Sequence, residues 1–258
     1  MDDVTLLQFR YSPYNEKVRW ALDLKRVAHQ RRSLLPGPHA LTVLRRTKQT
    51  ATPILALNGR WLAGSATIVA ALDERYPSPP LRPNAAAEKA EARDIEQRFD
   101  AGLVPRMRRA ALAALMTDPT FMCHLFGEGR GPLALALFRA AFPVSRILVA
   151  KGNGIAGPET IEDGKRACGE ALDFVAAKSA RTGYLVGDCF SSADLAAAAG
   201  LAMVFPPPGS PMDSLRSQPQ ASRTLADAWS AHPGIGWVRR IYTEHRPMIR
   251  DFDGRSPY

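Results

Sequence analysis

Cysteine is scarce in this chain of 258 residues, which has only Cys123, Cys168 and Cys189, all far apart. An odd number at such distances excludes a framework of disulfides, and no CxxC pair is present. This usage fits a reducing compartment, so we predict a cytoplasmic location. The five histidines also lack the spacing of metal ligands, and we therefore predict no metal site.

The chain also lacks an uncharged run of about 18 apolar residues, which a membrane helix would require. Its most apolar stretch, residues 132–150, contains Arg139, Pro143 and Arg146 and predicts buried or partly buried helices. The start, Met1-Asp2-Asp3, is acidic, whereas a signal peptide begins with positive charge. We expect neither a membrane span nor a signal peptide.

Acidic residues are outnumbered, since 34 Lys and Arg face 25 Asp and Glu for a net charge of +9. Residues 1–80 contain 12 basic and 6 acidic residues and so hold +6 of that charge. A basic surface can attract nucleic acid, but no nucleic-acid-binding motif accompanies these charges. We interpret them as solvated surface charges and predict no nucleic-acid partner.

The first 77 residues alternate between strand-like and helix-like patterns. Residues 4–9 (VTLLQF) predict a buried strand, and residues 15–26 predict an amphipathic helix with Val18, Ala21, Leu22 and Lys25 on one face. Further along we expect a strand at 29–35, a helix at 39–46, a hairpin at 52–64 that turns at Asn58-Gly59, and a helix at 65–77. The predicted order is β-α-β-α-β-β-α.

The composition changes after Pro77, where a proline-rich stretch reads as an extended linker. From there the pattern is helical and rich in alanine. We predict an α/β domain at 1–77, a linker at 78–90 and an all-helical domain at 91–258, without strands beyond residue 90. The tail from about Arg246 is expected to be a loosely packed extension.

Three segments resemble one known family. They are SPYNEKVRWAL (12–22), TPILALNGRWLAGSATIVAALDERYP (52–77) and GYLVGDCFSSADLAAA (183–198). In this order and at these separations they resemble a glutathione S-transferase of the bacterial soluble type with a serine in its active-site turn. The resemblance implies a thioredoxin-like N-terminal domain followed by an all-helical C-terminal domain, with glutathione as co-substrate, and a homodimer.

Ser12 precedes Pro13 at the predicted start of a helix. Its hydroxyl can cap that helix, or it can donate a hydrogen bond to a bound thiolate, which the helix N-terminus also favours. The resemblance implies the second role, with Ser12 as the catalytic group. Tyr11 is the alternative donor, and Tyr14 is expected to pack against the next helix or to line the substrate pocket. No cysteine occupies the turn, which disfavours thiol-disulfide exchange by the protein.

The resemblance also assigns the remainder of the glutathione site. Thr52-Pro53 would be a cis peptide bond, and the main chain of Thr52 would pair with the cysteinyl unit. Gly64 and Ser65 would lie where the γ-glutamyl carboxylate meets a helix N-terminus. The family usually has an acidic residue at the position of Gly64. For the glycine carboxylate, five basic residues stay open, namely Arg10, Lys17, Arg19, His39 and Lys48.

A small electrophilic molecule is the expected second substrate. Its pocket would be walled by the helical domain, with Met107, Met116, Phe121, Phe126 and Phe138 as candidates, although such residues are more often part of a core. In the helical domain, Ser191 and Asp194 form a capping box, to which we assign a structural role. The sequence thus predicts an enzyme that transfers glutathione to an electrophile. The alternative is a non-catalytic binding or regulatory protein with the same fold.

Overall fold

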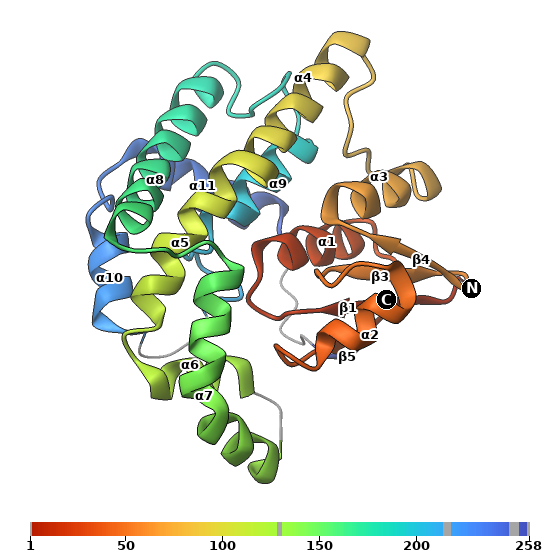
Figure 1. Ribbon diagram of the computed structural model, residues 1–258. Coiled ribbons are helices and arrows are strands. Elements are labelled where there is room, and N and C mark those ends of the chain that lie inside the picture. Colours follow the sequence, from red (N-terminus) through yellow and green to blue (C-terminus); the bar gives the residue numbers. More distant parts are fainter. Residues whose placement is uncertain (1, 128–130, 214–217, 248–252, 257–258) are drawn as a thin grey trace.

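The computed structural model describes residues 2–127, 131–213, 218–247 and 253–256. A small sheet flanked by helices forms its first part, and a larger group of helices forms its second part (Figure 1). The first part contains β1 (Val4–Gln8), α1 (Pro13–Leu24), β2 (Gln30–Ser33), α2 (His39–Thr47), β3 (Ile54–Leu57), β4 (Arg60–Ala63) and α3 (Ser65–Arg75). This is the predicted order of elements.

The sheet has the strand order β4-β3-β1-β2-β5, where β5 (Gly254–Arg255) comes from the far end of the chain. Strand β1 is parallel to β2 and antiparallel to β3. Helices α1 and α3 cover one face of the sheet, and α2 covers the other (Figure 1). The predicted thioredoxin-like fold is therefore confirmed.

The hairpin between β3 and β4 turns at Asn58 and Gly59, which have φ angles of 51° and 80°. Two consecutive positive φ values are the requirement of the tight hairpin turn that Asn-Gly favours. The strands pair from Ile54 with Ala63 to Leu57 with Arg60. The hairpin is thus the one expected from the sequence, and it brings Pro53 close to Gly64.

The helical part begins with α4 (Ala86–Gln97), inside the stretch that the sequence assigns to the linker. It continues through η1 (Arg98–Leu103, a π-helix), α5 (Val104–Leu115), α6 (Pro119–Gly127), α7 (Pro132–Gly152), α8 (Pro158–Ser179), α9 (Ser192–Leu201), α10 (Gln220–Asp227) and α11 (Pro233–His245). Among the described residues, no helix has both the length and the apolar composition needed to cross a bilayer.

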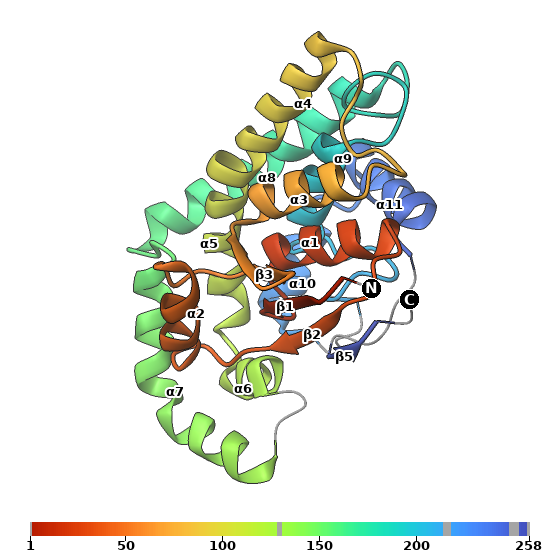
Figure 2. The same ribbon diagram turned by 90° about the vertical axis from the view of Figure 1, so that its right-hand side faces the viewer.

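One hydrophobic core joins the two parts. It includes Leu6 and Leu55 of the sheet, Phe99 of η1, Leu195 of α9 and Trp237 of α11. All ten residues of α9 are buried, and α1 lies between this helix and the sheet (Figure 2). Because both parts contribute to the same core, they are fixed against each other.

Helix α1 differs from the predicted amphipathic helix, since ten of its twelve residues are buried. Its charged residues Glu16, Lys17, Arg19 and Asp23 are at most 3% exposed. The prediction was wrong because the helical part covers the side of α1 that faces away from the sheet. These charges cannot be solvated surface charges, as we had interpreted them, and each requires a partner inside the protein.

The end of the chain also differs from the prediction. Arg246 is buried, and β5 adds an antiparallel strand to β2. Ser256 exchanges two hydrogen bonds with His29, of 2.8 and 3.0 Å. Two predictions are therefore wrong at these described residues. The tail is packed against the first domain, and a strand, β5, is present beyond residue 90 because the tail returns to the sheet.

Helix α7 is the third difference, because the stretch predicted as buried or partly buried helices is one helix that is mostly exposed. Its side chains Leu133, Leu137, Val144, Ile147 and Leu148 are 63–74% exposed. Of the α7 residues whose burial is described, Phe142 alone is buried. The helix projects from the lower end of the molecule (Figures 1 and 2), and it presents apolar side chains to the surroundings.

The capping box at the start of α9 is confirmed. The Asp194 carboxylate accepts hydrogen bonds from the backbone N–H of Ser191 at 2.9 Å and from its hydroxyl at 2.9 Å. It also accepts from the backbone N–H of Leu185 at 2.9 Å. One buried carboxylate therefore joins the start of α9 to the preceding turn.

We predict that Asp194→Ala lowers the free energy of unfolding by about 1–3 kcal/mol, because two buried N–H groups lose their acceptor. Burial raises the pKa of Asp194 to about 6, so urea denaturation should be measured above that pH. The control is Asp188→Ala, which removes an exposed carboxylate from the same turn. Equal stabilities of the two variants would contradict the prediction.

Candidate functional site

Ser12 is the N-cap residue of α1, with Pro13 at the start of the helix. Its carbonyl accepts from the backbone N–H groups of Asn15 at 3.1 Å and Glu16 at 2.9 Å. Its side chain makes no capping hydrogen bond and is half-buried. The hydroxyl is therefore not used by the helix, and it lies where the positive end of the helix dipole favours an anion.

The two neighbouring tyrosines have different surroundings. The hydroxyl of Tyr14 donates to the carbonyl of Asp100 at 2.8 Å, and burial raises its pKa to about 12. Tyr14 thus packs against η1 of the helical part, whereas the sequence suggested the next helix or the substrate pocket, and its hydroxyl proton is donated to this carbonyl. Tyr11 lines a small pocket together with Ser12 and stays the alternative donor.

The Thr52-Pro53 peptide bond is cis, as predicted. Thr52 lies next to the start of α1, since the side-chain amide of Asn15 donates to its hydroxyl at 3.2 Å. The carbonyl of Pro53 accepts from the backbone N–H of Gly64 at 3.3 Å. The start of α1, the Thr52-Pro53 segment and the start of α3 are therefore connected side by side.

Gly64 is the N-cap residue of α3, and Ser65 is its first residue and is 6% exposed. Gly64 has φ 86° and ψ 133°, a conformation that a residue with a Cβ rarely adopts. A Cβ there would meet nothing nearer than the Thr67 hydroxyl at 3.9 Å. The backbone, and not a lack of space, accounts for glycine at this position.

Three of the five basic candidates are engaged elsewhere. Arg10 pairs with Asp253 at 2.7 Å, Lys17 pairs with Glu96 at 2.6 Å, and Arg19 is fully buried. These contacts argue against them as ligands of a carboxylate.

His39 and Lys48 are the candidates still open. The ring of His39 accepts from the backbone N–H of Gly37 at 3.1 Å, and burial lowers its pKa. Lys48 is exposed and caps α2 with φ 57°, four residues before Thr52. Lys48 is therefore the better placed cation.

Tyr11 packs against an apolar cluster of the helical part. The buried members of this cluster are Leu115, Phe121, Met122, Cys123, Leu125, Phe142 and Met212, with Met116, Phe126 and Phe138 partly buried against it. Four of the five candidate wall residues are therefore members of this cluster. Met107 is not, because it is a residue of the main core.

A larger open pocket of about 620 Å³ lies between α6 and α7, lined by Cys123, Arg139, Phe142 and Arg146 among others. It contains none of the residues around Ser12. We regard the region around Ser12 as the candidate site, because the polar groups with the relevant chemistry lie there.

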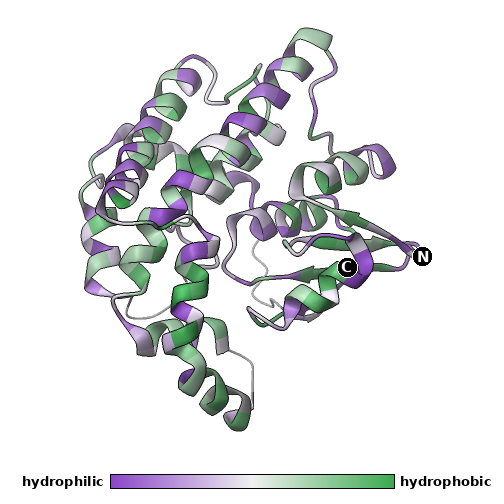
Figure 3. Cartoon of the chain, viewed as in Figure 1, coloured by the Kyte–Doolittle hydropathy of each residue, from purple (hydrophilic) through white to green (hydrophobic). Residues whose placement is uncertain are grey.

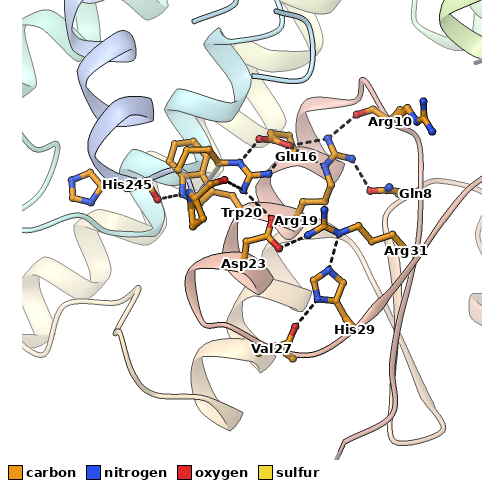
Figure 4. A network of polar contacts seen from close by, with 12 residues as sticks. Gln8, Arg10, Glu16, Arg19, Trp20, Asp23, Val27, His29, Arg31 and His245 are labelled. Atoms are coloured by element: carbon orange, nitrogen blue, oxygen red, sulfur yellow. Dashed lines mark hydrogen bonds and ion pairs between the residues drawn. The ribbon is translucent and has the colours of Figure 1, made fainter. Parts of the chain in front are cut away.

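A network of buried charges supports the turn of Arg10, Tyr11 and Ser12, called the Ser12 turn below (Figure 4). The guanidinium of Arg19 donates to the Arg10 carbonyl at 2.6 Å, to Gln8 at 2.6 Å and to Glu16 at 3.0 Å. The turn is therefore attached to α1 by a side chain in addition to its own backbone.

Arg246, which directly follows α11, extends this network. Its guanidinium donates to Glu16 at 2.7 Å and to Asp23 at 2.9 Å, and Asp23 also accepts from Arg31. Burial by itself raises the pKa of Glu16, but Arg246 and Arg19 outweigh burial and hold the pKa below its usual value. Glu16 is thus an ionised carboxylate in the interior.

This network was not predicted from the sequence. Glu16, Arg19 and Asp23 recur at helical spacing on one face, a pattern that ordinarily marks the solvated side of an amphipathic helix, so the local sequence pointed away from burial. Nothing local connects Glu16 with Arg246 either, because 230 positions separate them in the chain.

Comparisons with known proteins agree with this fold. Residues 6–80 match the model of the glutathione S-transferase N-terminal domain, and residues 133–229 match that of the glutathione S-transferase C-terminal domain. A probable glutathione S-transferase from potato is 31% identical over 94 residues, which are 36% of this chain and 43% of the potato protein. The match thus spans less than half of that curated relative.

Two solved structures are similar over nearly the whole chain. A glutathione S-transferase from Rhodospirillum rubrum has a TM-score of 0.65 and 19% identity, and the match covers 96% of this chain and 90% of that one. A rice glutathione S-transferase in complex with glutathione has a TM-score of 0.63 and 18% identity, with 95% and 91% covered. At these identities the likeness shows the fold.

We predict that Ser12→Ala changes the free energy of unfolding by less than about 0.5 kcal/mol, because the hydroxyl makes no capping bond. Urea denaturation of the two proteins measures this difference. A loss of about 1 kcal/mol or more would show that the hydroxyl caps α1 after all.

Proposed function

The chain belongs to the glutathione S-transferase family, and we propose that it is a transferase that joins the sulfur of glutathione to a small electrophilic molecule. The observation that carries this proposal is the Ser12 hydroxyl at the N-terminus of α1, which the helix does not use; the same helix reaches Thr52 through Asn15. We place the reaction in the reducing cytoplasm, where glutathione is kept as a thiol; the three free cysteines fit this.

Glutathione would lie across the starts of α1, β3 and α3. The main chain of Thr52 would pair with the cysteinyl unit as with a neighbouring strand. The hydroxyl of Ser65 and the first N–H groups of α3 would hold the γ-glutamyl carboxylate. Lys48 would pair with the glycine carboxylate. This assignment is supported by the contacts that connect Asn15 with Thr52 and Pro53 with Gly64.

Ser12 would stabilise the thiolate form of glutathione. A free thiol has a pKa of about 8.5, and lowering it to about 6.5 requires roughly 2.7 kcal/mol. A hydrogen bond to a charged group contributes roughly 1.5–3 kcal/mol, and a helix N-terminus adds roughly 0.3–1 kcal/mol. One hydroxyl at the end of α1 is therefore sufficient without a general base, and the thiol proton goes to water.

The thiolate sulfur would then form a bond with an electrophilic carbon. Either a leaving group departs with the bonding electron pair, or a carbon–carbon double bond next to a carbonyl takes up the electrons and a proton. The apolar cluster beside Tyr11 would hold the carbon skeleton of such a molecule, because it offers Met and Phe side chains.

Gly64 supports a second candidate function. Without a carboxylate at this position the γ-glutamyl amine lacks one charge-assisted partner. A protein that keeps the fold but binds glutathione weakly or not at all would act as a binding or regulatory protein. Retention on immobilised glutathione together with a conjugation assay separates the two candidates.

We predict that the thiol of bound glutathione has a lowered pKa and that Ser12→Ala raises this pKa by about one unit or more, since a charged hydrogen bond is lost. The ultraviolet absorbance of the thiolate, followed against pH in the complex, measures the pKa. The conjugation rate at about pH 6.5 should fall at least tenfold, with a smaller loss at high pH.

Tyr11→Phe is the matched variant, because it removes the other hydroxyl that lines the same pocket. It should leave the titration unchanged. If Tyr11→Phe raises the pKa and Ser12→Ala does not, Tyr11 is the donor. If unaltered protein binds no glutathione, the second candidate function holds.

We also propose that the protein is a homodimer, in which the first domain of each copy contacts the helical domain of the other. The exposed apolar side chains of α7 support this proposal, because a monomer rarely exposes several large apolar residues on one element. Figure 3 shows the hydrophobic stretches of this helix in green. Such a dimer would be symmetric, so that α7 of both copies is covered.

Light scattering at micromolar concentration should therefore give twice the chain mass of 28.1 kDa. Leu137→Glu should shift the mass toward that of one chain, because it places a charge in the apolar contact. Ala231→Glu, at an exposed site after α10, is the control. A mass of one chain for the unaltered protein would rule out the dimer.

A further inference from the structure

The end of α11 and the residues after it return to the first domain at two places. At the first place, the carbonyl of His245 accepts from the indole N–H of Trp20 at 2.7 Å, and Arg246 bridges Glu16 and Asp23. Glu16, Trp20 and Asp23 all belong to the buried part of α1 (Figure 4). The end of α11 is therefore attached to α1 through charged side chains without access to water.

At the second place, Asp253 holds the other side of the Ser12 turn. One carboxylate oxygen accepts from the Arg10 guanidinium at 2.7 Å, and the other accepts from the backbone N–H of Ser33 at 2.5 Å. Strand β5 follows directly and pairs with β2. Asp253 is thus fixed by the sheet at the position where it meets Arg10.

Arg10 is consequently held at both ends. Its carbonyl accepts from Arg19, which is oriented by Glu16 and thereby by Arg246. Its guanidinium is paired with Asp253. Arg10 lies two residues before Ser12, so both contacts from the C-terminal segment act on the short turn that carries the hydroxyl.

We propose that the C-terminal segment positions the thiol-activating hydroxyl, with Arg246 and Asp253 as positioning residues that fix the Ser12 turn from two sides. The inference rests on the proposed function, in that it requires a glutathione thiol beside Ser12. Neither residue touches that thiol. Both act through Arg10, which fixes the position of the turn. This position matters because a hydrogen bond to a thiolate is strong only when its donor is held at the right distance and angle.

Loss of Arg246 would also disfavour the thiolate through the charge of Glu16, in addition to displacing the Ser12 turn. Glu16 lines the pocket beside Ser12 and faces Arg19 on its own helix, Arg246 after α11 and Tyr242 of α11. When Arg246 is lost, Glu16 keeps its hydrogen-bonded partner Arg19 and the electrostatic influence of Arg31, while Asp23 still repels it. The less balanced negative charge of Glu16 then disfavours a second anion nearby.

A solely structural role makes a different prediction. If Arg246 and Asp253 only join the two ends of the chain, their loss lowers stability but leaves the chemistry of the folded molecules unchanged. The pKa of the bound thiol separates the two roles, because it is a property of the folded complex.

The experiment compares Arg246→Met, Arg246→Lys and Asp253→Asn with unaltered protein. The probe is glutathione itself, and the readouts are its dissociation constant, the pH titration of thiolate absorbance in the complex, and urea denaturation. Arg239→Met is the control, because this exposed arginine lies on the same helix, α11. Asp253→Asn alters a side chain that is 41% exposed, so this variant is expected to fold. It replaces Arg246→Met as the test if that variant does not fold.

We expect Arg246→Met to raise the pKa of the bound thiol by about one unit, which is a tenfold loss of thiolate at low pH. Asp253→Asn should raise it by about half as much, and Arg246→Lys should restore part of the loss. The control should match the unaltered protein. Glutathione affinity measured at about pH 6.5 or below should change less than threefold, because the thiol form binds mainly through Thr52 and Ser65; at higher pH the affinity falls further together with the thiolate.

Unchanged thiol titration in folded Arg246→Met, or in Asp253→Asn if the former does not fold, would overturn the inference while leaving the proposed function intact. If the unaltered protein does not lower the pKa of the glutathione thiol, the proposed function fails, and the inference fails with it.

Discussion

Helix α1 carries its charges inside the protein, and the way these charges pair determines where the Ser12 turn lies. Glu16, Arg19 and Asp23 are almost completely buried, so each must be matched by a partner. Removing one partner from such a group typically costs about 3–5 kcal/mol, because the remaining charge is left without compensation. Arg31 from the sheet and Arg246 from the end of the helical part complete the set. The first domain therefore cannot adopt its charge arrangement without the second.

The candidate site follows from that constraint. With α1 fixed, Asn15 reaches Thr52, and the hairpin after Pro53 returns to Gly64 at the start of α3. Two helix N-termini and one strand start then lie together, with Ser12 and Ser65 at their first turns. Under the proposed function, each of these groups would meet a different part of glutathione: a thiolate, a main-chain amide and a carboxylate. The helical part adds the apolar cluster beside Tyr11, where a second molecule would bind.

Local signals in the sequence predicted the elements that depend on local chemistry. Asn58-Gly59 predicted its hairpin, Ser12-Pro13 predicted a helix start, and Ser191 with Asp194 predicted a cap. The burial of α1 under α9, and the contacts of Arg246 with α1 and of Asp253 with Arg10, could not be predicted, because the partners lie far apart in the chain, by 230 positions for Arg246 and Glu16 and by 243 for Asp253 and Arg10. Met107 and Met116 show the same limit within one segment. Both lie in the stretch 104–116, but one turns toward the main core and the other toward the cluster beside Tyr11.

The central claim is that the Ser12 hydroxyl meets the sulfur of glutathione at the N-terminus of α1. A crystal structure of the complex with glutathione tests this most directly. The account predicts a sulfur atom within about 3.5 Å of the Ser12 oxygen, a cysteinyl main chain paired with Thr52 and a γ-glutamyl carboxylate at Ser65. A sulfur atom bound instead to the Tyr11 hydroxyl, or a glutathione molecule in the pocket between α6 and α7, would contradict it.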